Sequence, residues 1–236
     1  MKKVISIGHR GAKGYKPENT LPSFKHAMDL GCDWLELDVY FVSGELLVIH
    51  DKSVDRTTNG KGNVEDLPLD YLRSLDAGDG APIPTLNEVL CLVNNQCGVN
   101  VELKGKNTAQ PVSEVLANYD WPLEKFLLSS FNHKELAKSD PLYRRGALFE
   151  APTTNLWKRA EELRAWSVNF YLPNVTPELV REAQQRGYKV LVYTVNELAE
   201  IQHMLNLGVD GIFSDYPDRV NQVRGYKRYY DLSESK

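Results

Sequence analysis

Residues 34–50 read WLELDVYFVSGELLVIH, and this stretch decides the fold class. It contains two strand-like runs, Trp34–Val42 and Leu46–His50, which only Ser43-Gly44-Glu45 separates. Because parallel strands need a connection of a dozen or more residues, the two runs are predicted to form an antiparallel hairpin. One arm of this hairpin therefore stands outside any parallel series of strands.

Working outward from the hairpin, short β-rich runs alternate with helical patterns along nearly the whole chain, as in α/β proteins with a parallel sheet. The predicted strands are Val4–Gly8, Trp34–Val42, Leu46–His50, Val99–Leu103, Phe126–Ser130, Gly146–Phe149, Ser167–Tyr171, Val190–Val195 and Gly211–Ser214. Without one hairpin arm eight strands are left, and eight close a barrel whose centre side chains can fill. The length of 236 residues suits one (β/α)8 TIM barrel, which averages about 250.

Helix caps agree with this pattern. Threonine precedes three predicted helices, and glycine follows the ends of three. The predicted helices are Leu21–Leu30, Leu69–Leu75, Leu86–Asn94, Pro177–Arg186 and Glu197–Leu207. Turn residues dominate residues 51–84, which we interpret as an insertion of the kind that often forms binding loops. We expect a single barrel domain over residues 1–225 and a C-terminal tail over residues 226–236.

The composition is that of an ordinary globular protein, with 42% hydrophobic and 25% charged residues. A net charge of −4, without a basic block, argues against a nucleic-acid partner. The longest apolar run, Val89–Val93, is far shorter than the ~20 residues of a membrane span. His9-Arg10 interrupts the apolar N-terminal stretch before a signal core can form, so we expect a cytoplasmic protein. The oligomeric state is left open, with a homo-oligomer among the options.

The three cysteines, Cys32, Cys91 and Cys97, are an odd number in a chain large enough to build a core. Cys91 and Cys97 could be bridged, but we expect buried free thiols. No cysteine or histidine spacing typical of zinc sites occurs.

Acidic residues lie on strands whose other residues are apolar. Alternation puts Glu36 and Asp38 on one face of their strand, and it puts Glu102 and Lys104 on one face of another. Both faces can look into the barrel mouth, where the active sites of (β/α)8 barrels lie. Three converging carboxylates would repel one another unless a cation sits among them, and oxygen ligands suit Mg²⁺ or Ca²⁺ better than zinc. The alternative is a structural ion pair with Lys104 or Arg10.

The hairpin register decides whether His50 can join this site. We expect a three-residue loop with Gly44 in the left-handed conformation, which pairs Val42 with Leu46 and places Asp38 opposite His50. A two-residue loop would turn His50 to the other face.

Two histidines, His9 and His50, fall at strand ends beside charged residues. A pair of histidines across a metal site is the arrangement expected for a general acid and a general base at neutral pH. Arg10 and Lys104 supply the local positive charge that binding of a phosphoryl group requires.

Several motifs in order give the chain a family resemblance. They are Gly8-His9-Arg10-Gly11, Pro17-Glu18-Asn19-Thr20, Glu36-Leu37-Asp38-Val39, His50-Asp51, Glu102-Leu103-Lys104, Ser129-Ser130-Phe131 and Asp210-Gly211-Ile212-Phe213-Ser214-Asp215-Tyr216-Pro217. From residue 4 to about residue 220 the chain resembles the glycerophosphodiester phosphodiesterases, most of all the short cytoplasmic bacterial type. The resemblance implies a (β/α)8 barrel that hydrolyses glycerophosphodiesters to sn-glycerol 3-phosphate and an alcohol.

The resemblance also implies roles for single residues. Glu36, Asp38 and Glu102 match the positions that hold one divalent cation, and His9 and His50 match the acid–base positions. Arg10, Lys104, Glu18, Phe131 and Tyr193 match positions at the substrate, where Glu18 orients Arg10 or the substrate end. The family often has tryptophan where this chain has Tyr193, so the preferred alcohol group stays open.

Two other functions remain compatible with these residues. One is a phosphodiester lyase that stops at a cyclic phosphate, as in phospholipase D toxins with a similar barrel. The other is a barrel that binds phosphodiesters without catalysis. The two histidines at the mouth favour hydrolysis over simple binding.

Overall fold

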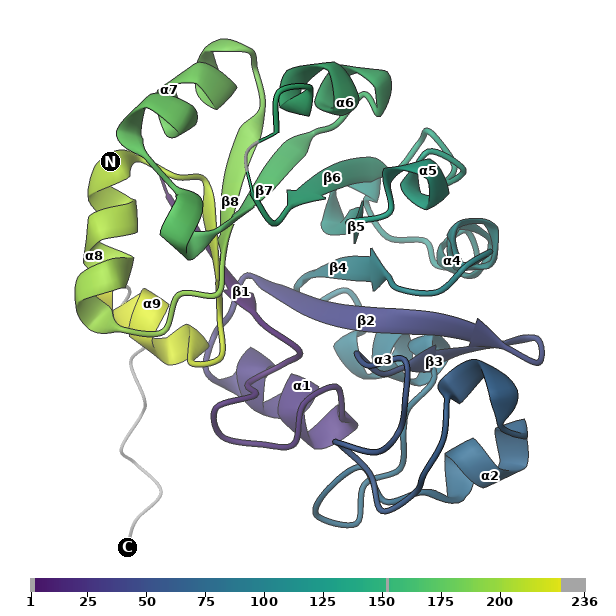
Figure 1. Cartoon of the computed structure of the whole chain (residues 1–236). Coiled ribbons are helices and arrows are strands. Elements are labelled where there is room, and N and C mark those ends of the chain that lie inside the picture. Colours follow the sequence, from purple (N-terminus) through teal and green to yellow (C-terminus); the bar gives the residue numbers. More distant parts are fainter. Residues whose placement is uncertain (1–2, 152, 226–236) are drawn as a thin grey trace, which may run out of the picture.

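The computed structural model describes residues 3–151 and 153–225, so the predicted tail at 226–236 lies outside the described residues. Eight parallel strands form a closed barrel with helices around it (Figure 1). They are β1 (Ile5–Gly8), β2 (Trp34–Val42), β4 (Gly98–Leu103), β5 (Phe126–Ser130), β6 (Arg144–Phe149), β7 (Ser167–Tyr171), β8 (Lys189–Tyr193) and β9 (Gly211–Ser214). Closure comes from β1, which pairs with both β9 and β2. The predicted (β/α)8 barrel is confirmed.

The predicted hairpin is present, but its predicted register is wrong. Strand β3 (Glu45–Val48) pairs antiparallel with β2, and Val42 lies opposite Glu45 instead of Leu46. The loop therefore has two residues, Ser43 and Gly44, with φ of 51° and 86°. Two positive φ values fit the type I′ turn, whose twist matches that of the flanking strands.

His50 nevertheless reaches the barrel mouth. Strand β3 ends at Val48, and the Ile49 N–H donates to the Asp38 carbonyl oxygen at 3.0 Å. His50 thus lies beyond the regular strand, where the alternation of side chains no longer fixes its direction. The expectation that a two-residue loop excludes His50 from the site fails for this reason.

Nine helices occur within residues 3–151 and 153–225. They are α1 (Leu21–Asp29), α2 (Leu69–Ser74), α3 (Leu86–Val93), α4 (Ala109–Leu116), α5 (His133–Leu136), α6 (Leu156–Glu162), α7 (Pro177–Gln185), α8 (Leu198–Leu207) and α9 (Pro217–Val223). The predicted threonine caps are confirmed, since Thr20, Thr85 and Thr176 each accept a hydrogen bond from the first turn of α1, α3 and α7. None of the described helices is long and apolar enough to cross a membrane.

Strand alternation separates the core from the site. Leu35, Leu37 and Val39 of β2 are fully buried in the main hydrophobic cluster, to which helix residues such as Phe24 and Leu90 also belong. The intervening residues of β2 point to the opposite face, into the barrel. A smaller apolar cluster there is formed by Ile7, Leu127, Leu191 and Phe213, with Trp34 and Trp166 packed against it. This inner apolar cluster fills the lower part of the barrel. Polar side chains that follow along the strands can therefore meet one another at the carboxyl ends of the strands.

Residues 51–84 lie between β3 and α3 and contain α2. Their buried apolar residues pack against the extension of β2 and β3 beyond the barrel, where Tyr40 and Leu47 are buried with Val54 and Leu72. The segment is thereby held beside the barrel mouth.

All three cysteines are free, as predicted. Cys32 and Cys97 are buried, but Cys91 is exposed, which corrects the expectation of three buried thiols. Cys91 lies on the outer side of α3, where its Sγ is 3.7 Å from the Tyr119 hydroxyl.

Gly11, in the loop after β1, should tolerate no side chain. Its φ is +86°, and a Cβ atom there would lie 2.4 Å from Ser23 Oγ. Gly44 has the same φ with nothing within 4 Å, so Gly44→Ala is a matched control that carries only the backbone strain of about 1–2 kcal/mol. We expect Gly11→Ala to lower the free energy of unfolding by about 1–3 kcal/mol more than the control. Urea denaturation measures both, and equal losses would contradict the steric argument.

Candidate active site

The carboxyl ends of the barrel strands surround a cavity of about 170 Å³. It is lined by His9, Arg10, Glu36, His50, Asn100, Glu102, Ser129, Phe131, Leu148, Tyr193, Thr194 and Phe213. The other residues predicted for the site, Asp38, Lys104 and Glu18, do not line it but contact residues that do. All the predicted site residues therefore gather in one region.

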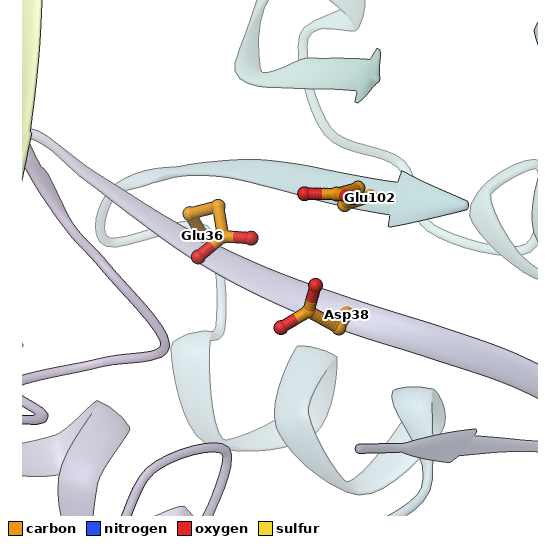
Figure 2. Close-up of side chains that lie close together, drawn as sticks. All are labelled: Glu36, Asp38 and Glu102. Carbon is orange, nitrogen blue, oxygen red and sulfur yellow. The ribbon is translucent and has the colours of Figure 1, made fainter. Parts of the chain in front are cut away.

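Three carboxylates form the most unusual feature of this region. Glu36 and Asp38 lie on β2, and Glu102 lies on β4 directly beside Asp38 in the strand register. One oxygen of each group can be chosen so that all three lie within 4.8 Å of one another. Figure 2 shows the three side chains converging between the two strands.

These carboxylates repel one another in a buried place. Glu36 is 3% exposed and Asp38 is not exposed at all. Burial, and then the neighbouring charges of Asp38 and Glu102, raises the pKa of Glu36 well above its ordinary value. Burial and Asp38 likewise raise the pKa of Glu102 to about 7. Asp38 Oδ1 is buried and makes no hydrogen bond to the described residues. A set of crowded, incompletely paired oxygen donors fits a hard divalent cation.

Two basic side chains contact the cluster without neutralising it. The Arg10 backbone N–H donates to Glu36 Oε2 at 2.8 Å, and Arg10 Nε lies 3.4 Å from Asp38 Oδ2. Lys104 Nζ donates to Glu102 Oε1 at 2.8 Å and lies 3.7 Å from Asp38 Oδ1. The structural ion pairs considered from the sequence are thus present. Burial and the neighbouring carboxylates nevertheless raise the pKa values of Glu36 and Glu102, so a bound cation would stabilise the ionised cluster further.

The two histidines are each held by an aspartate through Nδ1. His9 Nδ1 lies 2.6 Å from Asp215 Oδ1, and His50 Nδ1 lies 2.6 Å from Asp51 Oδ1. Burial lowers the pKa of both histidines, which favours neutral rings. A neutral ring that donates from Nδ1 to a carboxylate keeps its lone pair on Nε2. Lys104 Nζ lies 3.2 Å from Nε2 of His50.

Glu18 contacts the Arg10 guanidinium. Its Oε1 accepts hydrogen bonds from Arg10 and from Arg56 of the 51–84 segment, both at 2.8 Å. Arg56 also donates to both oxygens of Asp51. A chain of charges thus links Arg10 to the aspartate that holds His50.

Acid should weaken this network. Burial alone would raise the pKa of Glu18, but hydrogen bonds from Arg56 and the charge of Arg10 outweigh it and lower the pKa from 4.5 to about 2. The stability from Glu18 is therefore complete above about pH 4.5 and is lost as the pH falls toward 2. After solvent screening at the half-exposed Arg56, we expect Glu18→Gln to cost about 1–2 kcal/mol of unfolding free energy at pH 7. Urea titrations should show this difference shrink between pH 4.5 and 2; a constant difference would contradict it.

Asp215, Asn196, Asp51 and Arg56 were not predicted as site residues. Asp215 directly follows β9, and Asp51 follows His50, so the rule that polar residues after strand ends belong to the site could have found both. Asn196 and Arg56 lie in irregular segments, and no sequence pattern indicated their partners.

Comparisons with known proteins agree with this geometry. The sequence model described as the glycerophosphoryl diester phosphodiesterase family matches residues 9–219. A glycerophosphodiester phosphodiesterase of Caldanaerobacter subterraneus subsp. tengcongensis is 38% identical over an alignment of 240 positions, gaps included, that covers 94% of this chain and 98% of that protein. A glycerophosphodiester phosphodiesterase of Bacillus altitudinis is 36% identical over an alignment of 238 positions that covers 92% of this chain and 97% of that protein. The solved structure of an Oleispira antarctica phosphodiesterase in complex with the product sn-glycerol 3-phosphate superposes with a TM-score of 0.89, at 32% identity, and covers 95% of this chain and 97% of that one.

Proposed function

The chain belongs to the glycerophosphoryl diester phosphodiesterase family, and from that premise we propose that it releases sn-glycerol 3-phosphate and an alcohol from small glycerophosphodiesters, in a metal-dependent reaction that uses two histidines. Family membership makes it a phosphoric diester hydrolase. The observation that carries the finer proposal is that His9, His50 and two of the three clustered carboxylates line one cavity. The product bound to the Oleispira antarctica protein supports the same reaction.

Glu36, Asp38 and Glu102 would hold one divalent cation, Mg²⁺ or Ca²⁺, because their oxygens converge and Asp38 Oδ1 lacks a hydrogen-bond partner among the described residues. When bound, the cation would supply Lewis-acid polarisation of a phosphoryl oxygen, worth several kcal/mol in the transition state.

Arg10 and Lys104 would bind the phosphoryl group. Burial alone would lower the pKa of each, but the carboxylates around them outweigh it and raise both pKa values, so both side chains stay charged. Glu18 fixes the direction of the Arg10 guanidinium through its hydrogen bond.

His9 and His50 would carry the protons. One takes the proton from the attacking oxygen, either water or the glycerol 2-hydroxyl, and the other protonates the leaving alcohol. Both proton transfers use Nε2, because an aspartate occupies Nδ1 of each ring. The base starts as a neutral ring and takes the proton on its Nε2 lone pair, whereas the acid starts as an imidazolium, stabilised by its aspartate, and gives up its Nε2 proton.

Phe131 and Tyr193 would border the alcohol group. Their rings are in edge contact, with centroids 5.9 Å apart, and both line the cavity. Tyr193 is fixed by its hydroxyl, which donates to the Phe149 carbonyl at 2.9 Å.

The test is phosphorus NMR of the products formed from glycerophosphocholine and glycerophosphoethanolamine with Mg²⁺ or Ca²⁺ present. We expect glycerol 3-phosphate as the phosphorus-containing product. Accumulation of a cyclic phosphate would support a lyase instead. Substrate binding without turnover over hours would support a non-catalytic barrel.

A further inference from the structure

The aspartate that holds His9 is itself held by polar groups, and these have no role in the function proposed above. Asp215 Oδ1 contacts His9 Nδ1 at 2.6 Å, and both side chains are mostly buried, with exposures of 13% for His9 and 16% for Asp215. Hydrogen bonds from His9 and Asn196 outweigh burial and lower the pKa of Asp215, so its carboxylate is ionised and can only accept.

Asn196 in turn fixes the Asp215 carboxylate. Asn196 Nδ2 donates to Asp215 Oδ2 at 2.9 Å, while Asn196 Oδ1 accepts from the Asp215 backbone N–H at 2.9 Å and from the Ser214 hydroxyl at 3.2 Å. Two donors on Oδ1 leave the amide of Asn196 only one orientation. Arg219 also donates to the Asn196 carbonyl, at 2.8 Å, and so holds its backbone.

We propose that Asp215 and Asn196 are positioning residues that lock His9 in the tautomer with its proton on Nδ1 and its lone pair on Nε2. This inference rests on the proposed function, because only a reaction in which His9 moves a proton needs that lone pair. The loops after β8 and β9 would thereby contribute to catalysis without touching substrate.

His50 is held by different groups, with Asp51 at Nδ1 and the ammonium of Lys104 3.2 Å from Nε2. Asp51 is more exposed than Asp215, and both of its oxygens also accept hydrogen bonds from Arg56. Among the described residues, no side-chain amide donates to Asp51 as Asn196 donates to Asp215. The arrangement in which an asparagine amide fixes the carboxylate is therefore particular to His9.

The lock makes a definite prediction for Asp215→Asn. Asn196 Nδ2 is a donor, so the new amide must turn its oxygen toward Asn196 and its NH₂ group toward His9. That NH₂ group would donate to His9 Nδ1 and move the ring proton to Nε2. The corresponding change in a serine protease triad lowers kcat about 10⁴-fold with the geometry intact. We expect kcat of this enzyme to fall about 10²–10⁴-fold with KM nearly unchanged.

Exchanging the two side chains should restore the tautomer. In the double variant D215N/N196D, the carboxylate at position 196 accepts from the amide at position 215, whose oxygen then faces His9 Nδ1–H. We expect the double variant to have at least tenfold higher kcat than D215N. Asp218→Asn, the same change three residues along on a side chain whose one hydrogen bond among the described residues comes from the Tyr15 hydroxyl, is the matched control and should leave kcat unchanged.

The deciding measurement is ¹⁵N NMR of histidine-labelled protein with Mg²⁺ present, near pH 8, with the His9 signals assigned from their absence in His9→Ala. We expect the Nδ1–H tautomer in the wild type and in D215N/N196D, and the Nε2–H tautomer in D215N. A wild type with the Nε2–H tautomer would overturn the lock, and this result does not depend on whether any variant folds. A folded D215N protein that keeps the Nδ1–H tautomer or wild-type kcat would overturn it as well. If the wild type hydrolyses no glycerophosphodiester, the proposed function fails, while the NMR spectrum still reports the tautomer.

Discussion

Replacing either His9 or His50 by alanine should lower kcat for glycerophosphoethanolamine about 10²–10⁴-fold, the usual contribution of one positioned acid or base. Both rings line the cavity, and each presents Nε2 because an aspartate holds Nδ1. Since the two histidines act in the same turnover, the double variant should lose less than the product of the single losses. Release of glycerol 3-phosphate under single-turnover conditions measures each variant.

The control for this experiment is His203→Ala, because His203 is exposed on α8, outside the cavity. It should keep wild-type kcat. If His50→Ala also kept it, proton transfer by this histidine would be excluded, and Lys104, whose Nζ lies 3.2 Å from His50 Nε2, would be the next candidate.

The barrel could be predicted from sequence because its determinants are local. Four predicted strands, Trp34–Val42, Phe126–Ser130, Ser167–Tyr171 and Gly211–Ser214, match the structure residue for residue. Four helices, α4, α5, α6 and α9, were not predicted. In α5, which has only four residues, one turn gives too little apolar periodicity to recognise.

The hairpin shows where local reasoning fails. A type I′ turn is usually recognised by Asn-Gly or Asp-Gly, and here Ser43 takes the first left-handed position. The resulting register would have excluded His50, had the strand continued past Val48. In the structure β3 ends at Val48, whose N–H bonds to the Pro84 carbonyl, and no sequence pattern encodes that end.

Of the two aspartates that hold the histidines, one is a sequence neighbour of its histidine and the other is distant in sequence. Asp51 is adjacent to His50 in the chain, whereas Asp215 lies 206 residues from His9. The two meet because β9 closes the barrel against β1. Pairings of this kind follow from barrel closure, so they become visible only once the strand order is known.

The carboxylate cluster sets stability against function. Three buried carboxylates close together make folding less favourable when no metal is bound, since burial of an unpaired charge costs free energy. A cation that binds only the folded state would return that free energy by mass action. The same side chains should therefore destabilise the metal-free protein and stabilise the metal-bound one.

Glu36→Gln tests both halves of this argument. A carboxyl whose pKa is raised on folding opposes folding at pH values above its ordinary pKa, and Glu36 has such a shift. The amide keeps an oxygen for the Arg10 N–H, which now donates to Glu36 Oε2 at 2.8 Å. In EDTA at pH 7 we therefore expect Glu36→Gln to be more stable than the wild type by about 1–2 kcal/mol. Its kcat with Mg²⁺ or Ca²⁺ should fall about 10³-fold, since the cation's contribution of several kcal/mol is lost.

Urea unfolding with EDTA and with each cation separates the outcomes. The wild type should gain stability from Mg²⁺ or Ca²⁺, and the ion that stabilises it more at equal concentration is the better ligand for this site. Glu36→Gln should gain little from either. Glu178→Gln, on the exposed face of α7, is the control and should respond to cations as the wild type does. A wild type whose stability and kcat are the same with EDTA as with either cation would show that Arg10 and Lys104 alone offset the three carboxylates, and that the cluster is a structural ion-pair network.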